Sequence, residues 1–270
     1  ILSSMTHESP SSFFHFDGRH TGIVLPSINC SNFSNGLSFM VRFELGVVWA
    51  LPNKMPRLLS LLTTSKQRLE LYFNENKLVF EYQRNDKQTY RFSPEYIFQK
   101  NCWYHLVVTL DNSMLAFYIN GQNIGSFALK RGIKLDGIID NGRIANIALS
   151  KRTSSEMPLI FNMSCVYLFS SALTPETIQL MALLMSLLPI DFVYSFSPLP
   201  SNMNSEIPSQ CSSLFTEANN SNLVFCYNAR MTVDNTCANL ARNDVENATV
   251  RAHIIPFSTS FCDVTTNIGG

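Results

Sequence analysis

Charged residues are scarce in this sequence: they make up 15% of its 270 residues, and 20 Lys and Arg balance 20 Asp and Glu. A chain without net charge lacks the positive surplus with which DNA- and RNA-binding proteins neutralise phosphates. The same balance excludes adhesion to an acidic membrane by charge alone. The longest apolar run, 180–188, is about half as long as a membrane-spanning helix. We therefore expect no nucleic-acid partner and no direct membrane span.

Sequence motifs of several enzyme classes are missing as well. There is no G-x-S-x-G nucleophile elbow and no glycine-rich phosphate loop. An E-x-D-x-E-type run, which sandwich-fold glycosidases carry on one strand, is also absent. The seven cysteines show none of the two-residue spacings of zinc sites and redox dithiols. We interpret them as reduced thiols, and the N-x-S/T triplets as a product of the high Asn and Ser content. We expect no enzyme activity, no cofactor and no metal.

What the sequence does contain is a series of short apolar strands. From Phe13 to about Phe169, such segments are separated by Gly, Asn, Asp, Ser or Pro. Many of them alternate apolar and polar residues, as a half-buried strand does. Two tight turns, at 74–76 and at Asn120-Gly121, predict hairpins. Short strands at this regular spacing predict an antiparallel β-sandwich and argue against βαβ units.

One helix is expected after these strands. Thr174 can cap its N-terminus, Pro175 suits the first helical position, and Pro189 stops it. Apolar residues occur nearly all round the helix, so we expect it to contact two surfaces. One would be the sheet of this domain, and the other a neighbouring domain. Beyond Pro189 the chain becomes irregular, with a further strand expected at 223–227.

The carboxylates offer two hypotheses for chemistry. Glu70 and Glu81 could share one sheet face, as the acid and the nucleophile of sandwich-fold glycosidases do. Solvated surface charge is the favoured interpretation of both. Asp136, Asp140 and Asn141 form the only candidate calcium cluster, and a plain turn is the favoured explanation.

Other side chains were weighed in the same way. His105 alternates with Trp103 on a strand and is interpreted as a packed residue, not as a catalytic base. Cys102 is interpreted as a core thiol. Tyr72, Tyr82 and Tyr90 could line a sheet face as platforms for sugar stacking, although aromatic residues are also needed to fill the core. No residue is assigned to catalysis or to a ligand site.

Several segments resemble a known domain. Phe13–Gly18, Gly22–Pro26 and Asn35–Phe39 resemble the opening strands of the concanavalin A-like domain found in BEACH-family proteins. Trp103–Thr109 and Tyr118–Gln122 are shared by most laminin-G and pentraxin-like sandwiches, so they specify the fold and not the family.

Three later segments are more particular to the BEACH family. Val166–Phe169 and Ala172–Pro175 resemble its final strand and the helix after it. Leu223–Arg230 resembles a segment that follows this helix in BEACH proteins and is missing from general lectin domains. The sequence departs from the family at Arg42, where a Trp is frequent, and near Met163-Ser164, where a Gly is missing.

The resemblance implies an all-β, concanavalin A-like jelly-roll β-sandwich with one C-terminal helix and an irregular C-terminal extension. We expect residues 1–190 to form the sandwich with its closing helix. Residues 191–270 would pack on the sandwich or lead to a following domain. The Asn- and Ser-rich composition indicates a divergent fungal member.

The function implied by the resemblance is that of a non-catalytic binding or scaffolding module in a large cytosolic protein. Such proteins act in vesicle traffic and protein sorting, and they lie peripherally on endomembranes through their other domains. The ligand would be a protein partner, another domain of the same chain, or an oligosaccharide. The alternative is a secreted laminin-G or pentraxin-like carbohydrate-binding domain, which would carry glycosylated Asn and paired cysteines.

Overall fold

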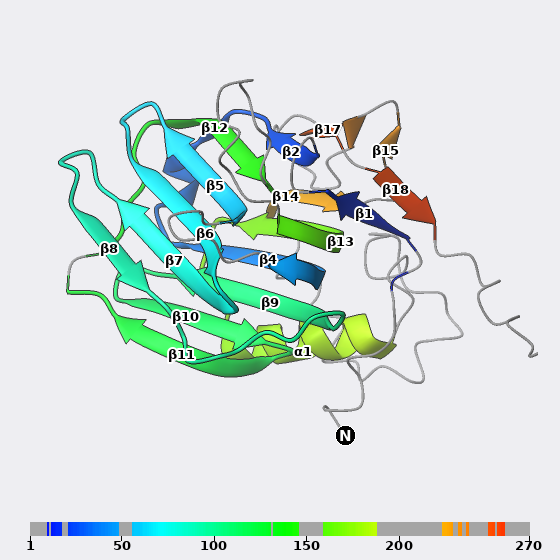
Figure 1. The fold of residues 1–270 in the computed structure, drawn as a ribbon. Helices are drawn as coiled ribbons and strands as arrows, with labels where there is room; N and C mark the ends of the chain where they lie inside the picture. Colours follow the sequence, from blue (N-terminus) through cyan, green and yellow to red (C-terminus); the bar gives the residue numbers. More distant parts are fainter. Residues whose placement is uncertain are drawn as a thin grey trace, which may run out of the picture.

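Two antiparallel sheets and one helix make up the fold (Figure 1). The structure is a computed structural model, and it describes residues 10, 12–17, 21–48, 56–130, 132–145, 159–187, 223–228, 232–233, 236–237, 248–251 and 253–256. The expected all-β sandwich with one helix after its last long strand is confirmed.

The first sheet, called sheet A, has eight strands within the described residues. Their order is β11-β10-β9-β4-β13-β1-β18, and β14 pairs with β13. The strands are β1 (Ser12–Phe16), β4 (Leu37–Val48), β9 (Trp103–Leu110), β10 (Met114–Ile119), β11 (Gln122–Ala128), β13 (Leu159–Phe169), β14 (Leu223–Asn228) and β18 (His253–Pro256).

The second sheet, called sheet B, has ten strands in the same part of the chain. Their order is β15-β16-β17-β2-β12-β5-β6-β7-β8, and β3 pairs with β12. The strands are β2 (Gly22–Leu25), β3 (Ile28–Asn29), β5 (Arg57–Thr63), β6 (Arg68–Asn74), β7 (Lys77–Gln83), β8 (Thr89–Phe92), β12 (Ile138–Ile144), β15 (Thr232–Val233), β16 (Thr236–Cys237) and β17 (Ala248–Arg251). A short 3-10 helix, η2 (Cys30–Phe33), follows β3.

The two predicted hairpins are confirmed, and their turns have the backbone that such hairpins need. Glu75 has a φ of 57° between β6 and β7, and Asn120 and Gly121 have φ values of 51° and 81° between β10 and β11. At Asn120-Gly121, positive φ at both central residues matches the twist of the flanking strands. A Cβ on Gly121 would lie 3.2 Å from the Cα of Gln179. Glycine therefore also allows the helix to approach this turn closely.

Aromatic side chains fill the space between the sheets. Phe43 of sheet A lies 6.1 Å from Phe73 of sheet B, measured between ring centroids, and 5.9 Å from Phe98. All three are buried, and burying such a side chain contributes about 1.5–3 kcal/mol relative to leaving it exposed. The largest fully buried side chains are Phe14, Phe16, Phe39, Phe43, Phe73, Phe80, Phe98, Phe117, Phe161 and Phe169.

Helix α1 (Pro175–Leu187) covers part of the outer face of sheet A. It is capped as expected, because the Thr174 hydroxyl accepts a hydrogen bond from the backbone N–H of Thr177 at 3.3 Å. Ile178 and Met181 are buried against the sheet, in a cluster with Met40, Val107, Ala116, Tyr118, Cys165, Tyr167, Phe169 and Leu223. Leu183 is exposed, and contact with a neighbouring domain stays a prediction. Pro189 lies outside the described residues.

Strands from beyond residue 191 extend both sheets. β14 pairs with β13, β18 pairs with β1, and β17 pairs with β2, all antiparallel. The strand expected at 223–227 is confirmed, whereas β15 to β18 were not expected from the sequence. None of the described helices is long and apolar enough to cross a membrane.

Candidate functional site

The outer face of sheet B carries a row of polar residues that crosses five strands. The register places Arg143 of β12 beside Ser60 of β5, Ser60 beside Glu70 of β6, Glu70 beside Glu81 of β7, and Glu81 beside Arg91 of β8. The expectation that Glu70 and Glu81 share one sheet face is confirmed. We call this set the transverse row. Two carboxylates therefore occupy directly opposed positions, where like charges destabilise a sheet unless they are neutralised.

Glu70 is buried under two arginines. Only 5% of the residue is exposed, and its Oε1 lies 2.9 Å from Nε of Arg57 and 3.9 Å from Nε of Arg68. The Ser60 hydroxyl donates a hydrogen bond to the same oxygen at 3.2 Å. The interpretation of Glu70 as a solvated surface charge is therefore wrong. A carboxylate at this depth requires a charged partner, since taking an unpaired charge out of water costs several kcal/mol.

Glu81 is held in a similar way on the next strand. Its Oε2 accepts a hydrogen bond from the Tyr72 hydroxyl at 3.0 Å and lies 2.6 Å from Nε of Arg91. Burial raises the pKa of Tyr72 to about 12, and the hydrogen bond to Glu81 adds to this shift. Tyr72 is therefore a protonated donor at neutral pH. The hydrogen bond to Glu81 raises the pKa of Arg91, whose guanidinium group is therefore charged at neutral pH.

These contacts determine what the carboxylate pair can do. A glycosidase needs one carboxyl group as a proton donor and a second one that faces the sugar or a water molecule. In the transverse row, each carboxylate already contacts a guanidinium group and accepts a hydrogen bond from a hydroxyl group. The arrangement is an ion-pair network that allows two like charges to sit opposite each other.

The three tyrosines considered as sugar platforms do not line one face. Tyr72 points to the outer face of sheet B, whereas Tyr82 belongs to the core between the sheets. Tyr90 stacks on Tyr82 with 6.3 Å between ring centroids. Tyr72 and Tyr82 are 3% and 2% exposed. The hypothesis of a shared stacking platform is wrong for these residues, because alternation along paired strands sends them to opposite sides.

The candidate calcium residues and Cys102 lie near the core and the turns. Asp136 precedes β12, and its backbone N–H donates a hydrogen bond to Oε1 of Gln67 at 2.6 Å. Asp140 and Asn141 belong to β12, next to an irregularity in its register. No group of three His, Cys, Asp or Glu side chains that could hold a metal ion occurs in the described ranges. Cys102 packs against the core, as the sequence predicted.

His105 lies on the outer face of sheet A, beside Arg42 in the register. It is 5% exposed, and neither ring nitrogen has a hydrogen-bond partner. Burial lowers the pKa of His105 to about 3, and the positive charge of Arg42 lowers it further. The imidazole is therefore neutral at pH 7 and packed, as expected. The Arg42 guanidinium carbon lies 5.9 Å from the ring centroid of Trp103, a stacking contact that the sequence did not reveal.

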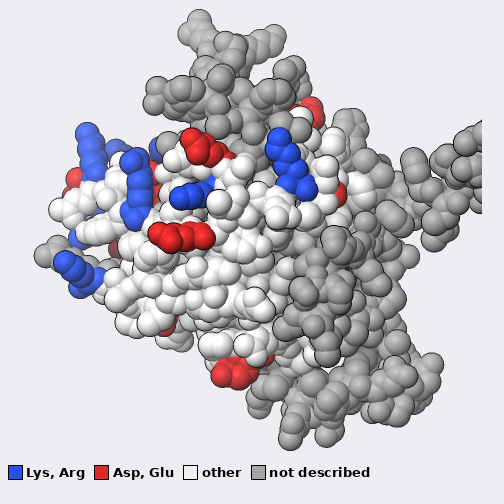
Figure 2. Space-filling view, turned by 60° about the horizontal axis from the view of Figure 1, so that its bottom comes forward, with Lys and Arg blue, Asp and Glu red and all other residues white. Residues whose placement is uncertain are grey.

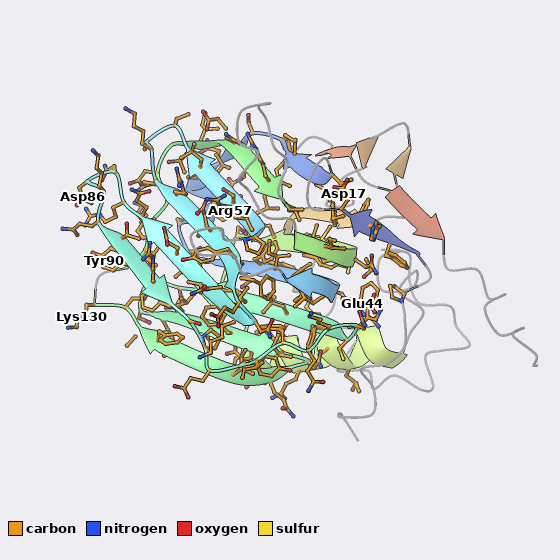
Figure 3. The ribbon with its side chains drawn as sticks, in the orientation of Figure 1. Asp17, Glu44, Arg57, Asp86, Tyr90 and Lys130 are labelled. Carbon is orange, nitrogen blue, oxygen red and sulfur yellow. The ribbon has the colours of Figure 1, made fainter. Side chains whose placement is uncertain are left out.

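A second polar chain crosses three strands of sheet A. Nδ1 of His15 and Oδ1 of Asn162 are hydrogen-bonded at 2.7 Å, and Nδ2 of Asn162 donates to Oε2 of Glu44 at 2.7 Å. The register of β1, β13 and β4 brings these residues together. In Figure 3, Glu44 lies at the opposite side of the molecule from Asp86. Sequence reasoning missed this chain because its members are far apart in the sequence.

The sequence was compared with known families and structures. Residues 17–179 match the concanavalin A-like lectin/glucanases superfamily, and the chain belongs to this superfamily. Among solved structures, a candidate carbohydrate binding protein from Bacteroides ovatus is similar with a TM-score of 0.57 and 16% identity, over 92% of this chain and 60% of that one. The receptor binding domain of botulinum neurotoxin mosaic serotype C/D has a TM-score of 0.53 and 12% identity, over 65% of this chain and 43% of that one.

These similarities agree with the two-sheet architecture, and at such low identity they define the fold. The chain spans less than two thirds of the length of either protein. The comparison with curated proteins gave no match.

The buried ion pair gives a stability prediction. Replacing Arg57 by Leu removes the nearest cation from buried Glu70, so we expect the free energy of unfolding to fall by about 3 kcal/mol. The matched variant Arg91→Leu removes a side chain that is 64% exposed, and we expect a loss of less than about 1 kcal/mol. Urea unfolding followed by circular dichroism measures both. Combining Arg57→Leu with Glu70→Leu should restore most of the loss. If both single variants lost the same small amount of unfolding free energy, the ion pair of buried Glu70 would not contribute to stability.

The depressed pKa of His105 gives a pH prediction. The folded protein binds this proton only near pH 3, whereas the unfolded chain binds it near about pH 6.5. The contribution of neutral His105 is therefore complete above about pH 6.5 and is lost as the pH falls toward 3. Between pH 7 and 4.5 the wild type should lose about 2–3 kcal/mol more than His105→Phe, at about 1.4 kcal/mol per pH unit. Urea titrations at both pH values measure this difference, and parallel profiles would contradict it.

Proposed function

We propose that this chain is a non-catalytic binding module of a large cytosolic BEACH-type protein that acts in vesicle traffic and protein sorting. The non-catalytic part of this proposal rests on the contacts of Glu70 and Glu81. Each carboxylate is held by an arginine and a hydroxyl donor on the same sheet face. The residues most similar to a glycosidase pair thus serve to stabilise the sheet. Membership of a superfamily that includes lectins supports binding as the role.

The BEACH assignment is supported by the place of the three segments that resemble this family. Val166–Phe169 is the end of β13, and Ala172–Pro175 leads directly into α1. The strand β14 lies in the third segment, which general lectin domains lack. It pairs with β13 from Cys165 to Phe169. Two of the segments are therefore neighbours in sheet A, and Ala172–Pro175 connects this sheet to α1. The Asn- and Ser-rich composition supports a divergent fungal member.

The same strand pairing supports a proposal for the domain boundary. We propose that residues 191–270 belong to the sandwich and do not begin a separate domain. The support is that β14, β17 and β18 each pair with a strand from the first 170 residues. A separate domain would not use its backbone groups in this way, because paired strands share one sheet.

A protein partner is favoured over an oligosaccharide. Lectins often bind sugars on an exposed aromatic ring, which supplies a flat apolar face. In the described part of the chain, the large hydrophobic residues that are exposed are Val24, Ile97, Met114, Ile138 and Leu183, none of them aromatic. The aromatic residues there are buried, or partly buried beside other apolar side chains. Oligosaccharide binding is the alternative that the binding experiment below tests.

The described cysteines support a reducing compartment. Cys30, Cys102 and Cys165 are free thiols, and burial raises the pKa of Cys30 to about 11. A thiol with this pKa is unreactive at neutral pH. Cys211 and Cys262 lie outside the described residues.

The compartment can be tested by counting thiols. We expect all seven cysteines of the chain to react with a thiol reagent when protein purified from its own host without reductant is denatured. Protein denatured with reductant serves as the control for complete reaction. A count lower by two or more thiols, together with glycosylated Asn, would favour the secreted laminin-G or pentraxin-like alternative.

The binding role can be tested on the purified chain. We expect specific retention of a protein partner in a pull-down, no binding on a glycan array, and no release of reducing sugar ends from a panel of polysaccharides. An Arg57→Leu, Glu70→Leu variant, which removes the buried pair, should behave like the wild type in the polysaccharide assay. Glycan binding without a protein partner would overturn the preferred ligand class. Hydrolysis that this variant loses would overturn the non-catalytic assignment.

A further inference from the structure

One end of sheet B carries a concentration of positive charge that the balanced composition of the chain does not predict. Its cations are the exposed or partly exposed Lys66, Arg68, Arg84, Lys87 and Arg91. We call these five residues the basic rim. Figure 2 shows most of the Lys and Arg side chains of that view toward this end of the molecule, with Asp and Glu side chains among them.

The strand register brings the basic rim together. Lys66 lies in the turn between β5 and β6, and Arg68 begins β6. Arg68 pairs with Gln83, so Arg84, the next residue, is at the same end of the sheet. Lys87 lies in the turn between β7 and β8, and Arg91 is in β8. In Figure 3, Asp86 in this turn and Tyr90 in β8 lie at this end of the sheet, well away from Arg57.

Three carboxylates lie among these cations, and one of them, Glu70, lies 2.9 Å from Nε of Arg57 and 3.9 Å from Nε of Arg68. Asp86 is 3.9 Å from Nε of Arg84, and Glu81 is 2.6 Å from Nε of Arg91. With Arg57 counted beside the five cations of the rim, the three carboxylates leave a local surplus of three positive charges.

On the β12 side, the exposed Asp136 and Asp140 change the sign of the surface. Asp136 borders the rim itself, because its backbone N–H is hydrogen-bonded to Oε1 of Gln67, the residue between Lys66 and Arg68. The boundary between the two regions limits an acidic ligand to the side of β7 and β8.

The rim also borders a free sheet edge. β8 ends the strand order of sheet B, and among the described residues its outer edge pairs with no strand. Open edges can accept an extended peptide through main-chain hydrogen bonds, with side chains giving specificity. Clustered positive charge at such an edge also opposes pairing with a second copy of the same chain. The same cations that repel a second copy attract an acidic segment.

We propose that the basic rim and the edge of β8 dock an extended, carboxylate-rich segment of a protein partner. This inference rests on the proposed binding function and specifies the chemistry of the partner. Guanidinium groups match carboxylates in a bidentate geometry. Arg91 uses Nε for Glu81, which fixes the guanidinium plane and leaves its terminal edge for a second carboxylate. Glu81 and Asp86 interrupt the positive surface, so it is poorly suited to a continuous phosphate backbone.

The direct test uses a defined peptide. A labelled ten-residue peptide that alternates Glu with Val is titrated by fluorescence anisotropy, and its Gln-for-Glu counterpart is the ligand control. We expect the wild type to bind the Glu peptide at least ten times more tightly than the Gln peptide. We also expect affinity to fall as NaCl is raised from 50 to 150 mM, because exposed charges are screened. Equal affinity for the two peptides would overturn the proposal.

Two matched variants locate the site. Arg84→Glu with Lys87→Glu reverses two charges in the rim and should weaken binding of the Glu peptide at least tenfold. Lys77→Glu with Lys100→Glu reverses two exposed charges away from the rim, and should change affinity less than twofold. Thermal unfolding establishes that both variants are folded. Equal effects of the two pairs would mean that net charge, and not the rim, attracts the peptide.

Two further ligands test whether the rim binds nucleic acid or lipid instead, and the pull-down separates this inference from the proposed function. A short DNA duplex or phosphatidylserine vesicles that bind the rim more tightly than the Glu peptide would overturn the acidic-peptide assignment. If the partner retained in the pull-down is lost by the rim variant, both proposals stand. If the rim variant keeps that partner, the rim is not the docking surface, while the binding function itself is upheld.

Discussion

The architecture depends on one apolar contact, in which Phe43 of sheet A meets Phe73 of sheet B and the neighbouring Phe98. Successive side chains of a strand point to opposite faces of the sheet. The neighbours of each residue that points into the core therefore lie on an outer face. The outer faces then differ in how they are covered. Sheet A receives the apolar face of α1, whereas sheet B receives the transverse row and its arginines. The residues that alternate with the core residues therefore determine the chemistry of each outer surface.

Local signals were sufficient for much of the fold. The turn at Asn120-Gly121 needs positive φ, which Asn and Gly tolerate, and the turn at 74–76 is short and polar, so both hairpins could be predicted. The helix start could be predicted because Thr174 and Pro175 act within one turn. β5 could not be recognised, because its sequence is apolar at most positions and lacks alternation. The strands β15 to β18 are too short to have a pattern, and only their pairing with sandwich strands defines them.

The site was harder to predict than the fold, for a physical reason. That Glu70 and Glu81 share a face follows from alternation and hairpin length. The burial of Glu70 depends on its ion pair with Arg57, a residue of the neighbouring strand β5. The register of β5 shifts between Arg57 and Leu59, so the position of Arg57 could not be counted from the sequence. The separation of Tyr72 from Tyr82 also follows from alternation, and a strict count along the two strands would have revealed it. The contact of Arg42 with Trp103 joins residues of β4 and β9 that no local pattern connects.

The pairing of β1 with β18 has a mechanical consequence. Ser12, at the start of β1, lies opposite Pro256, at the end of β18, so the start of the first described strand and the end of the last one lie at one corner of the sandwich. Tension applied at these two points would open the pair like a zipper, one hydrogen-bonded rung after another, instead of shearing all rungs together. The sandwich would therefore resist stretching poorly at this corner, while the aromatic layer behind it remained intact.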